Sequence, residues 1–180
     1  MRDGRRILAP VTDIGAAAKR ASAYLTEHPG EAVYRDSHAR ARLTVGLRAE
    51  VEGPGGERLS TDMPKGIGGG AAMPSPGWYF RAAAAACVAS LIGIRAAMTG
   101  VELPPDSIEV TVDSESDDRG ILGVDDRIPA GALSLRVVVT ARGDGAPGRE
   151  GLEALAQWAV DHCPVTDTAQ RAVPIEVRIG

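Results

Sequence analysis

Cysteine is scarce in this chain, which has only two cysteines among 180 residues, Cys87 and Cys163. Two cysteines are too few to build a disulfide scaffold, and a reducing cytosol would keep a merely structural pair in the thiol form. If these two cysteines pair, we therefore expect their disulfide to be transient.

Aromatic side chains and blocks of positive charge are also scarce. The chain has two Trp, three Tyr and one Phe, a formal net charge of -4 and a pI of about 5.4. A nucleic-acid-binding protein needs a basic surface, and one that binds single strands needs aromatic side chains on which bases stack. We therefore expect no nucleic-acid partner.

Long apolar runs are missing as well. The basic N-terminal stretch lacks the continuous apolar core of a signal peptide, and no run approaches the roughly 18 residues that a transmembrane helix needs. The sequence therefore predicts a cytoplasmic protein with no membrane partner.

Apolar residues make up 44% of the chain, which is enough for one globular domain with a real core, whereas two domains would each be small. We expect an N-terminal extension over residues 1–37 and one domain over residues 38–180. Residues 13–27 have the composition of a helix that stops before Pro29 and Gly30. The extension is therefore expected to be helical, and either to pack on the domain or to trail from it.

A long central helix is the clearest predicted element of the domain. Ser75 is a typical N-cap and Pro76 suits the first helical position, so we expect an alanine-rich helix from there to about Met98. Apart from Arg81 and Arg95, this helix is apolar nearly all the way round. Such a helix is buried in a core or against a partner chain.

The predicted strands come in antiparallel pairs. Apolar and polar residues alternate over residues 38–53, which predicts one half-buried strand, and a Gly-rich turn then leads to a second strand over residues 57–63. The remaining predicted elements are strands at 106–116 and 133–143, an amphipathic helix at 148–163 and a closing strand at 172–180. The order ββαββαβ, with paired strands around a long buried helix, indicates an α+β fold.

Several motifs have a functional and a plain structural explanation. The stretch GIGGGA at residues 66–71 has the letters of a dinucleotide fingerprint, but no strand abuts it and prolines delay the next helix, so we expect a flexible loop beside a site. The acidic residues 113–126 lack the central Gly and terminal Glu of an EF-hand loop, which favours a solvated turn. His28, His38 and His162 show no metal-ligand spacing. We therefore expect neither a metal nor a cofactor.

Cys87 poses the central question of the sequence, because five consecutive alanines precede it. A free cysteine is most often a small buried packing residue, but small neighbours also clear space around a thiol that reacts. His162 has two explanations as well: it could tune the adjacent Cys163 thiol, or interact with the last carbonyls of its own helix.

An ordered set of motifs resembles a known family. Ser75-Pro76, an alanine-rich helix that carries AAC at Cys87, and CPV at Cys163 resemble the OsmC/Ohr family of osmotically induced and organic hydroperoxide resistance proteins. The resemblance spans roughly residues 38–180, including the DDRGILG turn and the closing strand. It implies that Cys87 is the peroxidatic thiol and Cys163 the resolving thiol. It also implies an intertwined homodimer with active sites at the subunit interface, hydroperoxide substrates and a dithiol reductant such as a lipoylated protein.

The chain departs from the family pattern at the start of the central helix. Family members read Asn-Pro-Glu, and the Glu holds an Arg that stabilises the thiolate, whereas residues 75–77 of this chain read Ser-Pro-Gly. The cation that would activate Cys87 is therefore open. Arg48, predicted on the first strand, is the first candidate, and Lys65, in the loop before the helix, is the second. Arg81 lies six residues before Cys87, about 120° away around the helix, and is a poor partner within one chain.

Trp78, Tyr79 and Phe80 cluster at the start of the central helix. They either line an apolar path for an alkyl or lipid-like peroxide, or pack in the core or a dimer interface. Two functions follow for the chain. The first is a thiol peroxidase of oxidative-stress defence, which the retention of both cysteines favours. The second is an OsmC-like binding module without efficient peroxidase activity, holding an apolar or thiol-containing ligand at the dimer interface, which the loss of the Glu favours.

Overall fold

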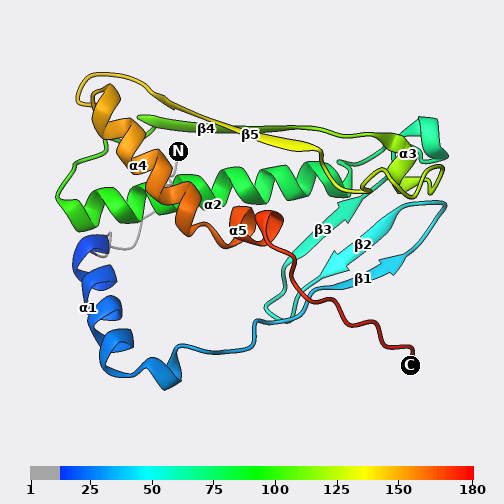
Figure 1. The fold of residues 1–180 in the computed structure, drawn as a ribbon, viewed down its shortest axis with the longest axis horizontal. Helices are drawn as coiled ribbons and strands as arrows, with labels where there is room; N and C mark the ends of the chain where they lie inside the picture. Colours follow the sequence, from blue (N-terminus) through cyan, green and yellow to red (C-terminus); the bar gives the residue numbers. More distant parts are fainter. Residues whose placement is uncertain (1–12) are drawn as a thin grey trace, which may run out of the picture.

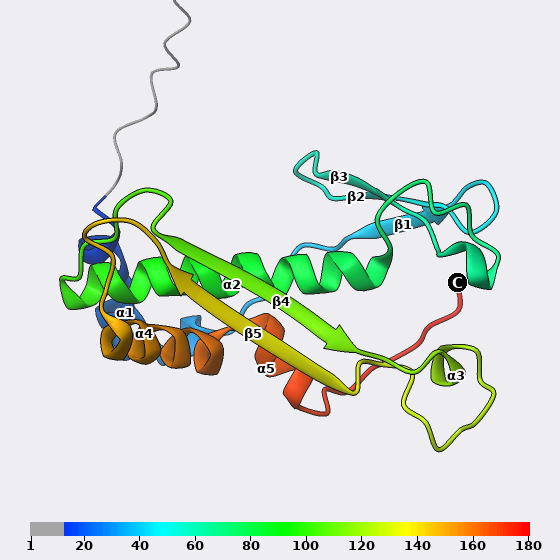
Figure 2. The same ribbon diagram turned by 90° about the horizontal axis from the view of Figure 1, so that it is seen from above.

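The computed structural model describes residues 13–180 and has the expected α+β architecture (Figure 1). The long helix α2 (Pro76–Thr99) runs through the middle of the molecule. A two-stranded antiparallel sheet and helix α4 pack along it, and a three-stranded antiparallel sheet lies beyond its N-terminal end (Figures 1 and 2).

Helix α2 begins and ends where the capping residues predict. The Ser75 hydroxyl accepts the Trp78 N–H at 3.2 Å, and Gly100 ends the helix in the left-handed region at φ 75°, a conformation that glycine adopts at little cost. Only one stripe of α2 is fully buried: Ala84, Val88, Ile92 and Ala96, spaced four residues apart. The other faces of this apolar helix remain partly or fully exposed in the single chain.

By length and composition α2 could cross a membrane, because its most apolar window has a mean hydropathy of 1.6. The sequence-based expectation that no such run exists is therefore wrong. The core helix of a soluble protein meets the same criterion, and α2 supplies three of the six residues of the central core cluster. The criterion is thus weak evidence for a membrane.

The core is formed by α2, α4 (Arg149–His162) and the hairpin of β4 (Ile108–Glu115) and β5 (Ser134–Ala141). These elements confirm the predicted helix and strand pair. Its buried cluster comprises Val88, Ile92, Ala96, Leu155, Ala159 and Cys163. Apolar residues of β4 and β5 pack against this cluster from one side, and the hairpin crosses α2 obliquely (Figure 2).

The three-stranded sheet corrects the prediction of one long strand at residues 38–53. The chain reverses there, giving β1 (Arg40–Leu43) and β2 (Ala49–Glu52), and β2 pairs in turn with β3 (Arg58–Thr61). Gly46 lies in the turn at φ 61°, which a residue with a side chain rarely adopts. The apolar alternation continues through the turn at Val45 and Leu47, so periodicity alone hides the reversal.

The predicted closing strand at residues 172–180 is absent from the described chain. These residues are extended and exposed, and no neighbouring strand of the described chain pairs with them. The sequence analysis predicted that α4 leads directly to the closing strand. The structure instead has a short helix after α4, α5 (Pro164–Gln170), which the sequence analysis missed. The remaining short elements are η1 (Pro29–Glu31), η2 (Lys65–Ile67) and α3 (Asp118–Ile121).

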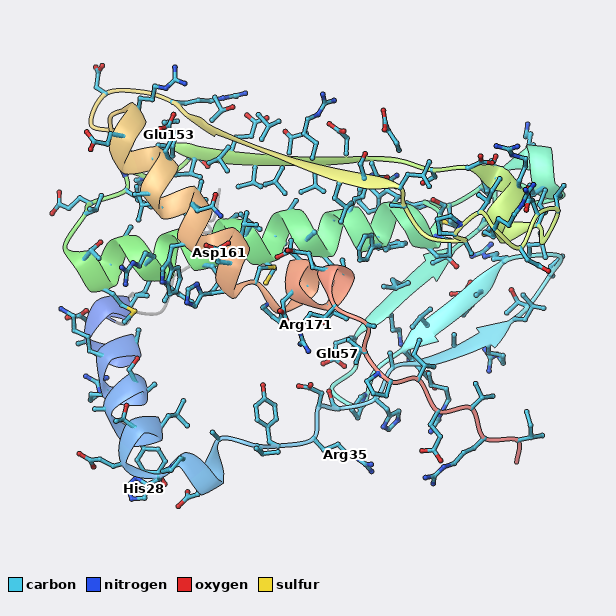
Figure 3. The ribbon with its side chains drawn as sticks, in the orientation of Figure 1. His28, Arg35, Glu57, Glu153, Asp161 and Arg171 are labelled. Atoms are coloured by element: carbon cyan, nitrogen blue, oxygen red, sulfur yellow. The ribbon has the colours of Figure 1, made fainter. Side chains whose placement is uncertain are left out.

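Helix α1 (Ile14–Glu27) confirms the helix predicted in the N-terminal extension, with Asp13 as its N-cap. Its start packs on the end of α2, where a Cβ on Gly15 would lie 2.5 Å from the carbonyl oxygen of Ala97. Its other end projects away from α2, as the position of His28 shows (Figure 3). The boundary between an extension at 1–37 and a domain at 38–180 stays a prediction, and residues 1–12 lie outside the described part.

The chain exposes far more surface than a compact protein of its mass. It exposes 13900 Å², whereas a compact 18.7 kDa protein exposes about 8,300 Å². Residues 1–12, even if fully extended, account for only about 1,900 Å² of this excess. Exposed apolar residues lie in three places. These are the stretch between η1 and β1 (Val33), the three-stranded sheet with its first turn (Leu43 and Val45), and the C-terminal segment 172–180 (Ile175, Val177 and Ile179).

Candidate functional site

The fold brings the two cysteines together. Cys87, on α2, packs against the buried cluster that contains Cys163. Cys163 is fully buried at the junction of α4 and α5, whereas Cys87 is half-buried, and both are free thiols. A pair of neighbouring thiols with one more accessible member is the arrangement that two-step thiol chemistry requires.

The two thiols differ in their electrostatic surroundings. Burial raises the pKa of Cys87, and the neighbouring Cys163 raises it further, while the N–H of Val165 acts in the opposite direction. Burial also opposes ionisation of Cys163, but hydrogen bonds from the Thr166 N–H, the Cys87 thiol and the Thr166 hydroxyl outweigh it and lower the pKa of Cys163. Among the groups of the described chain that shift the pKa of Cys87, none is a cation.

The two candidate cations lie near the loop before α2. Arg48 is in the turn between β1 and β2, where its Nη2 lies 2.9 Å from Oε1 of Glu50. Its charge contributes to the lowered pKa of Asp62, and Ala49, the residue after Arg48, pairs with Thr61, the residue before Asp62. Lys65 is exposed at the start of η2. Neither shifts the pKa of Cys87 within one chain.

Arg81 and His162 are both engaged away from the thiols. The Arg81 guanidinium donates to the Ser114 hydroxyl at 3.2 Å, which ties α2 to β4. His162 stacks on Trp158 with ring centroids 4.2 Å apart, and its Nδ1 lies 2.8 Å from the Trp158 carbonyl oxygen. The histidine therefore caps its own helix, as the structural alternative predicts.

The three aromatic residues at the start of α2 diverge. Phe80 lines a groove, whereas the Tyr79 hydroxyl donates to the Ser60 carbonyl at 3.2 Å and joins α2 to β3. Trp78 is half exposed and contacts Tyr79 edge-on, with ring centroids 5.2 Å apart. Of the three, only Phe80 is in a position to line a path for an apolar substrate.

The groove that Phe80 lines has a volume of about 1160 Å³. Its walls come from the loop after β3, the first turns of α2, the β4–β5 hairpin and α5, and its lining is mostly apolar. Val160 and Thr166 form part of the wall, and the Thr166 hydroxyl donates to the Cys163 carbonyl oxygen at 3.2 Å. The groove thus reaches the neighbours of Cys163.

A buried carboxylate organises the Gly-rich loop on the rim of this groove. Asp62 is only 5% exposed and accepts N–H groups from Met63, Gly70 and Ala72 at 2.8, 3.2 and 3.1 Å. The Ala72 hydrogen bond contributes most to the lowered pKa of Asp62. The GIGGGA stretch therefore wraps a carboxylate of its own chain, and α2 begins only at Pro76, so the stretch lacks the context of a dinucleotide site.

The close packing of this loop can be tested with a matched pair of substitutions. A Cβ on Gly69 would lie 1.9 Å from the Met63 carbonyl oxygen, whereas a Cβ on Gly66 would meet nothing within 4 Å. We expect Gly69→Ala to displace the loop and lower the melting temperature by several degrees, and Gly66→Ala to leave it nearly unchanged. Differential scanning calorimetry of both variants tests this, and equal melting temperatures would contradict it.

Several residues of the site were not singled out from the sequence: Glu50, Ser60, Asp62 and Thr166. Their roles depend on cross-strand register and on backbone N–H directions. The only available signal was Thr166 at the second position after Pro164, close enough to bond the end of α4.

Comparisons with known proteins concern the family and the fold of the chain. The family model of OsmC-like proteins matches residues 68–178. An organic hydroperoxide resistance protein of Legionella pneumophila is similar in structure, with a TM-score of 0.59, 21% identity, and coverage of 77% of this chain and 91% of that chain. No curated protein sequence matches the chain.

Two further solved structures are similar. OhrB of Bacillus subtilis, an organic hydroperoxide resistance protein, has a TM-score of 0.54 and 19% identity, with 76% of this chain and 91% of that chain covered. An OsmC-like protein of Mycoplasma pneumoniae has a TM-score of 0.61 and 14% identity, with 77% and 89% covered. At these identities the structures show a common fold. The family model, which matches more than half of the chain, shows that the chain belongs to the OsmC-like family.

Proposed function

We propose that this protein is a thiol-dependent peroxidase that reduces organic hydroperoxides, with Cys87 as the peroxidatic and Cys163 as the resolving thiol. The observation that carries the proposal is the contact between Cys87 and the buried cluster of Cys163. Two thiols that meet across the fold, the outer one more accessible, suit a cycle of oxidation and disulfide formation. The hydroperoxide resistance proteins with the same fold support the choice of substrate.

The chemistry runs in three balanced steps. The Cys87 thiolate attacks one peroxide oxygen, so that an S–O bond forms, the O–O bond breaks, and the alkoxide takes a proton and leaves as an alcohol. The Cys163 thiolate then attacks the Cys87 sulfenic acid, so that the S–S bond forms, the S–O bond breaks, and the leaving hydroxide takes a proton and departs as water. A dithiol, for which a lipoylated protein is our candidate, returns two electrons and two protons. Because this cycle needs reduced dithiols, the cytoplasm is the expected compartment of the protein.

The surroundings of Cys163 suit the resolving role. Hydrogen bonds from Thr166 and Val165 lower its pKa against the opposing effect of burial. Its ionisation is thus favoured, although the thiol is closed to bulk solvent. A buried thiol beside its partner thiol is placed to attack the sulfenic acid before a second peroxide oxidises Cys87 further.

No cation of residues 13–180 shifts the pKa of Cys87, so the proposed mechanism needs a cation from elsewhere. Arg48 precedes Ala49, which pairs with Thr61, and the N–H of the next residue, Asp62, donates to the Pro74 carbonyl, close to the start of α2. Cys87 lies eleven residues into the helix, about 16 Å along its axis. We therefore propose that Arg48 of a second copy approaches Cys87 in an intertwined homodimer. The large exposed surface supports such an assembly, since obligate dimers bury about 2,000–5,000 Å² in total.

A second function has its own support. The groove beside Phe80 is large and mostly apolar, and burial raises the pKa of Cys87. A binding module that holds an apolar or thiol-containing ligand would have these properties without efficient peroxidase chemistry.

Single-turnover kinetics separates the two functions. Pre-reduced protein is mixed with one equivalent of cumene hydroperoxide, or of hydrogen peroxide in parallel, and free thiols are counted over time. We expect rapid loss of both thiols in the wild type, faster with cumene hydroperoxide, and a trapped sulfenic acid at Cys87 in Cys163→Ser. Thiols that persist for many minutes would exclude the peroxidase and leave the binding module.

A further inference from the structure

The candidate cation is held by a carboxylate of its own sheet. Arg48 Nε donates to Glu50 Oε1 at 3.0 Å, and Arg48 Nη2 lies 2.9 Å from the same oxygen. The second oxygen of Glu50 accepts the Ser60 hydroxyl at 2.6 Å. Glu50 and Ser60 are directly opposed in the β2–β3 register, so the pair of strands fixes the carboxylate from one side and the arginine from the other.

This cluster of Arg48, Glu50 and Ser60 is more enclosed than the other ion pairs. The Arg48 side chain is 39% exposed, the lowest value among the arginines in ion pairs of residues 13–180. On the same strand, Glu52 lies 3.7 Å from Arg40, with side chains 56% and 69% exposed. The Glu50 carboxylate accepts hydrogen bonds from both Arg48 and Ser60, which fixes the geometry of this half-buried pair. Exposed ion pairs, by contrast, contribute little to stability.

The first turn of α2 holds no carboxylate that could take this role. It contains no acidic residue, and Gly77 stands where the resembling family has Glu. A Cβ on Gly77 would lie 3.7 Å from Arg81 Nη1, an ordinary contact, so the position has room for a side chain. The chain therefore lacks the family's orienting group at a position that could hold one.

We infer that Glu50, fixed by Ser60, is the positioning residue for Arg48 and takes over the task of the missing Glu at the start of α2. The inference rests on the proposed function, because it assigns a partner to the proposed cation. Both contacts use the Nε–Nη2 edge of the guanidinium, which leaves the Nη1 edge to face a thiolate of the second copy. The Ser60 hydrogen bond contributes most to the lowered pKa of Glu50, so the carboxylate stays charged at neutral pH.

The test compares Glu50→Gln with Glu52→Gln, a matched control two residues along the same strand. Each change is made in the Cys163→Ser background, and the pKa of Cys87 is taken from the pH dependence of its alkylation by iodoacetamide. We expect Glu50→Gln to raise the pKa of Cys87 by about one unit and to slow alkylation at neutral pH about tenfold. Glu52→Gln should match the background protein, and Ser60→Ala should shift the pKa in the same direction by less.

Folding and function are controlled separately. Circular dichroism and sedimentation must show that each variant keeps its fold and assembly, and Gly77→Glu combined with Glu50→Gln should recover part of the lost reactivity. Equal alkylation profiles for the Gln variants at 50 and 52 would overturn the inference, even if the wild type reduces peroxides. A wild type without peroxidase activity would refute the proposed function instead, since alkylation requires no peroxide.

Discussion

Removal of residues 172–180 is expected to weaken self-association by at least about a hundredfold and to abolish peroxide turnover. Val173, Ile175, Val177 and Ile179 alternate along this segment with Pro174, Glu176 and Arg178, the pattern of a strand with one apolar face. In the single chain the four apolar residues are 43%, 90%, 79% and 93% exposed. The strand that the sequence predicts thus has no neighbouring strand within residues 13–180, and we expect it to pair with a sheet edge of the second copy.

Sedimentation velocity at several protein concentrations measures the effect. Two double variants keep the length of the chain. Ile175→Asp with Val177→Asp places charge on the apolar face and should reproduce the truncation. Glu176→Ala with Arg178→Ala, which removes an exposed ion pair, should leave the assembly intact. A truncated chain that sediments like the full-length protein would refute the role of this segment.

The elements with strong local signals were predictable from the sequence. Ser75, Pro76 and Gly100 specify the ends of α2 through hydrogen-bond caps and a left-handed residue, and the predicted helix agrees with the structure. The β4–β5 strands and α4 follow from periodicity, since each presents one apolar face to the core. In these elements the local preference and the tertiary packing demand the same conformation.

The errors arose where the local pattern was ambiguous. The turn at Gly46 lies within an unbroken apolar alternation, so the sequence resembles one strand although the chain reverses. The closing segment has a strand pattern, but no strand of the described residues lies beside it. Periodicity reports which face is apolar, and says nothing about which chain covers that face.

Some features of the candidate site were likewise predicted at the sequence level, and others were missed. The pairing of Cys87 with Cys163 followed from the resemblance to a family, because no spacing rule connects thiols on different helices. Glu50 was missed because its partnership with Ser60 depends on the β2–β3 register, which the misplaced turn obscured. Cross-strand neighbours become visible only when the register is known.

Replacement of Ile92 by alanine is expected to have the largest effect on stability. Ile92 is the largest fully buried side chain of residues 13–180 and belongs to their six-residue core cluster. Loss of its buried methyl and methylene groups should lower the free energy of unfolding by about 3–4 kcal/mol, and Ile92→Val by about 1 kcal/mol. Denaturant titrations followed by circular dichroism measure both values.

Ile94, two residues along α2, provides the matched control for this core substitution. Ile94 is only partly buried in the single chain. If the single chain is the folded unit, Ile94→Ala should therefore lower the free energy of unfolding by less than Ile92→Ala does. If the second copy covers the exposed faces of α2, Ile94→Ala should lower the free energy of unfolding nearly as much as Ile92→Ala does. The unfolding midpoint must then also rise with protein concentration. A small effect at position 94 together with a concentration-independent midpoint would mean that the chain folds alone, and the proposal of an intertwined dimer would fail.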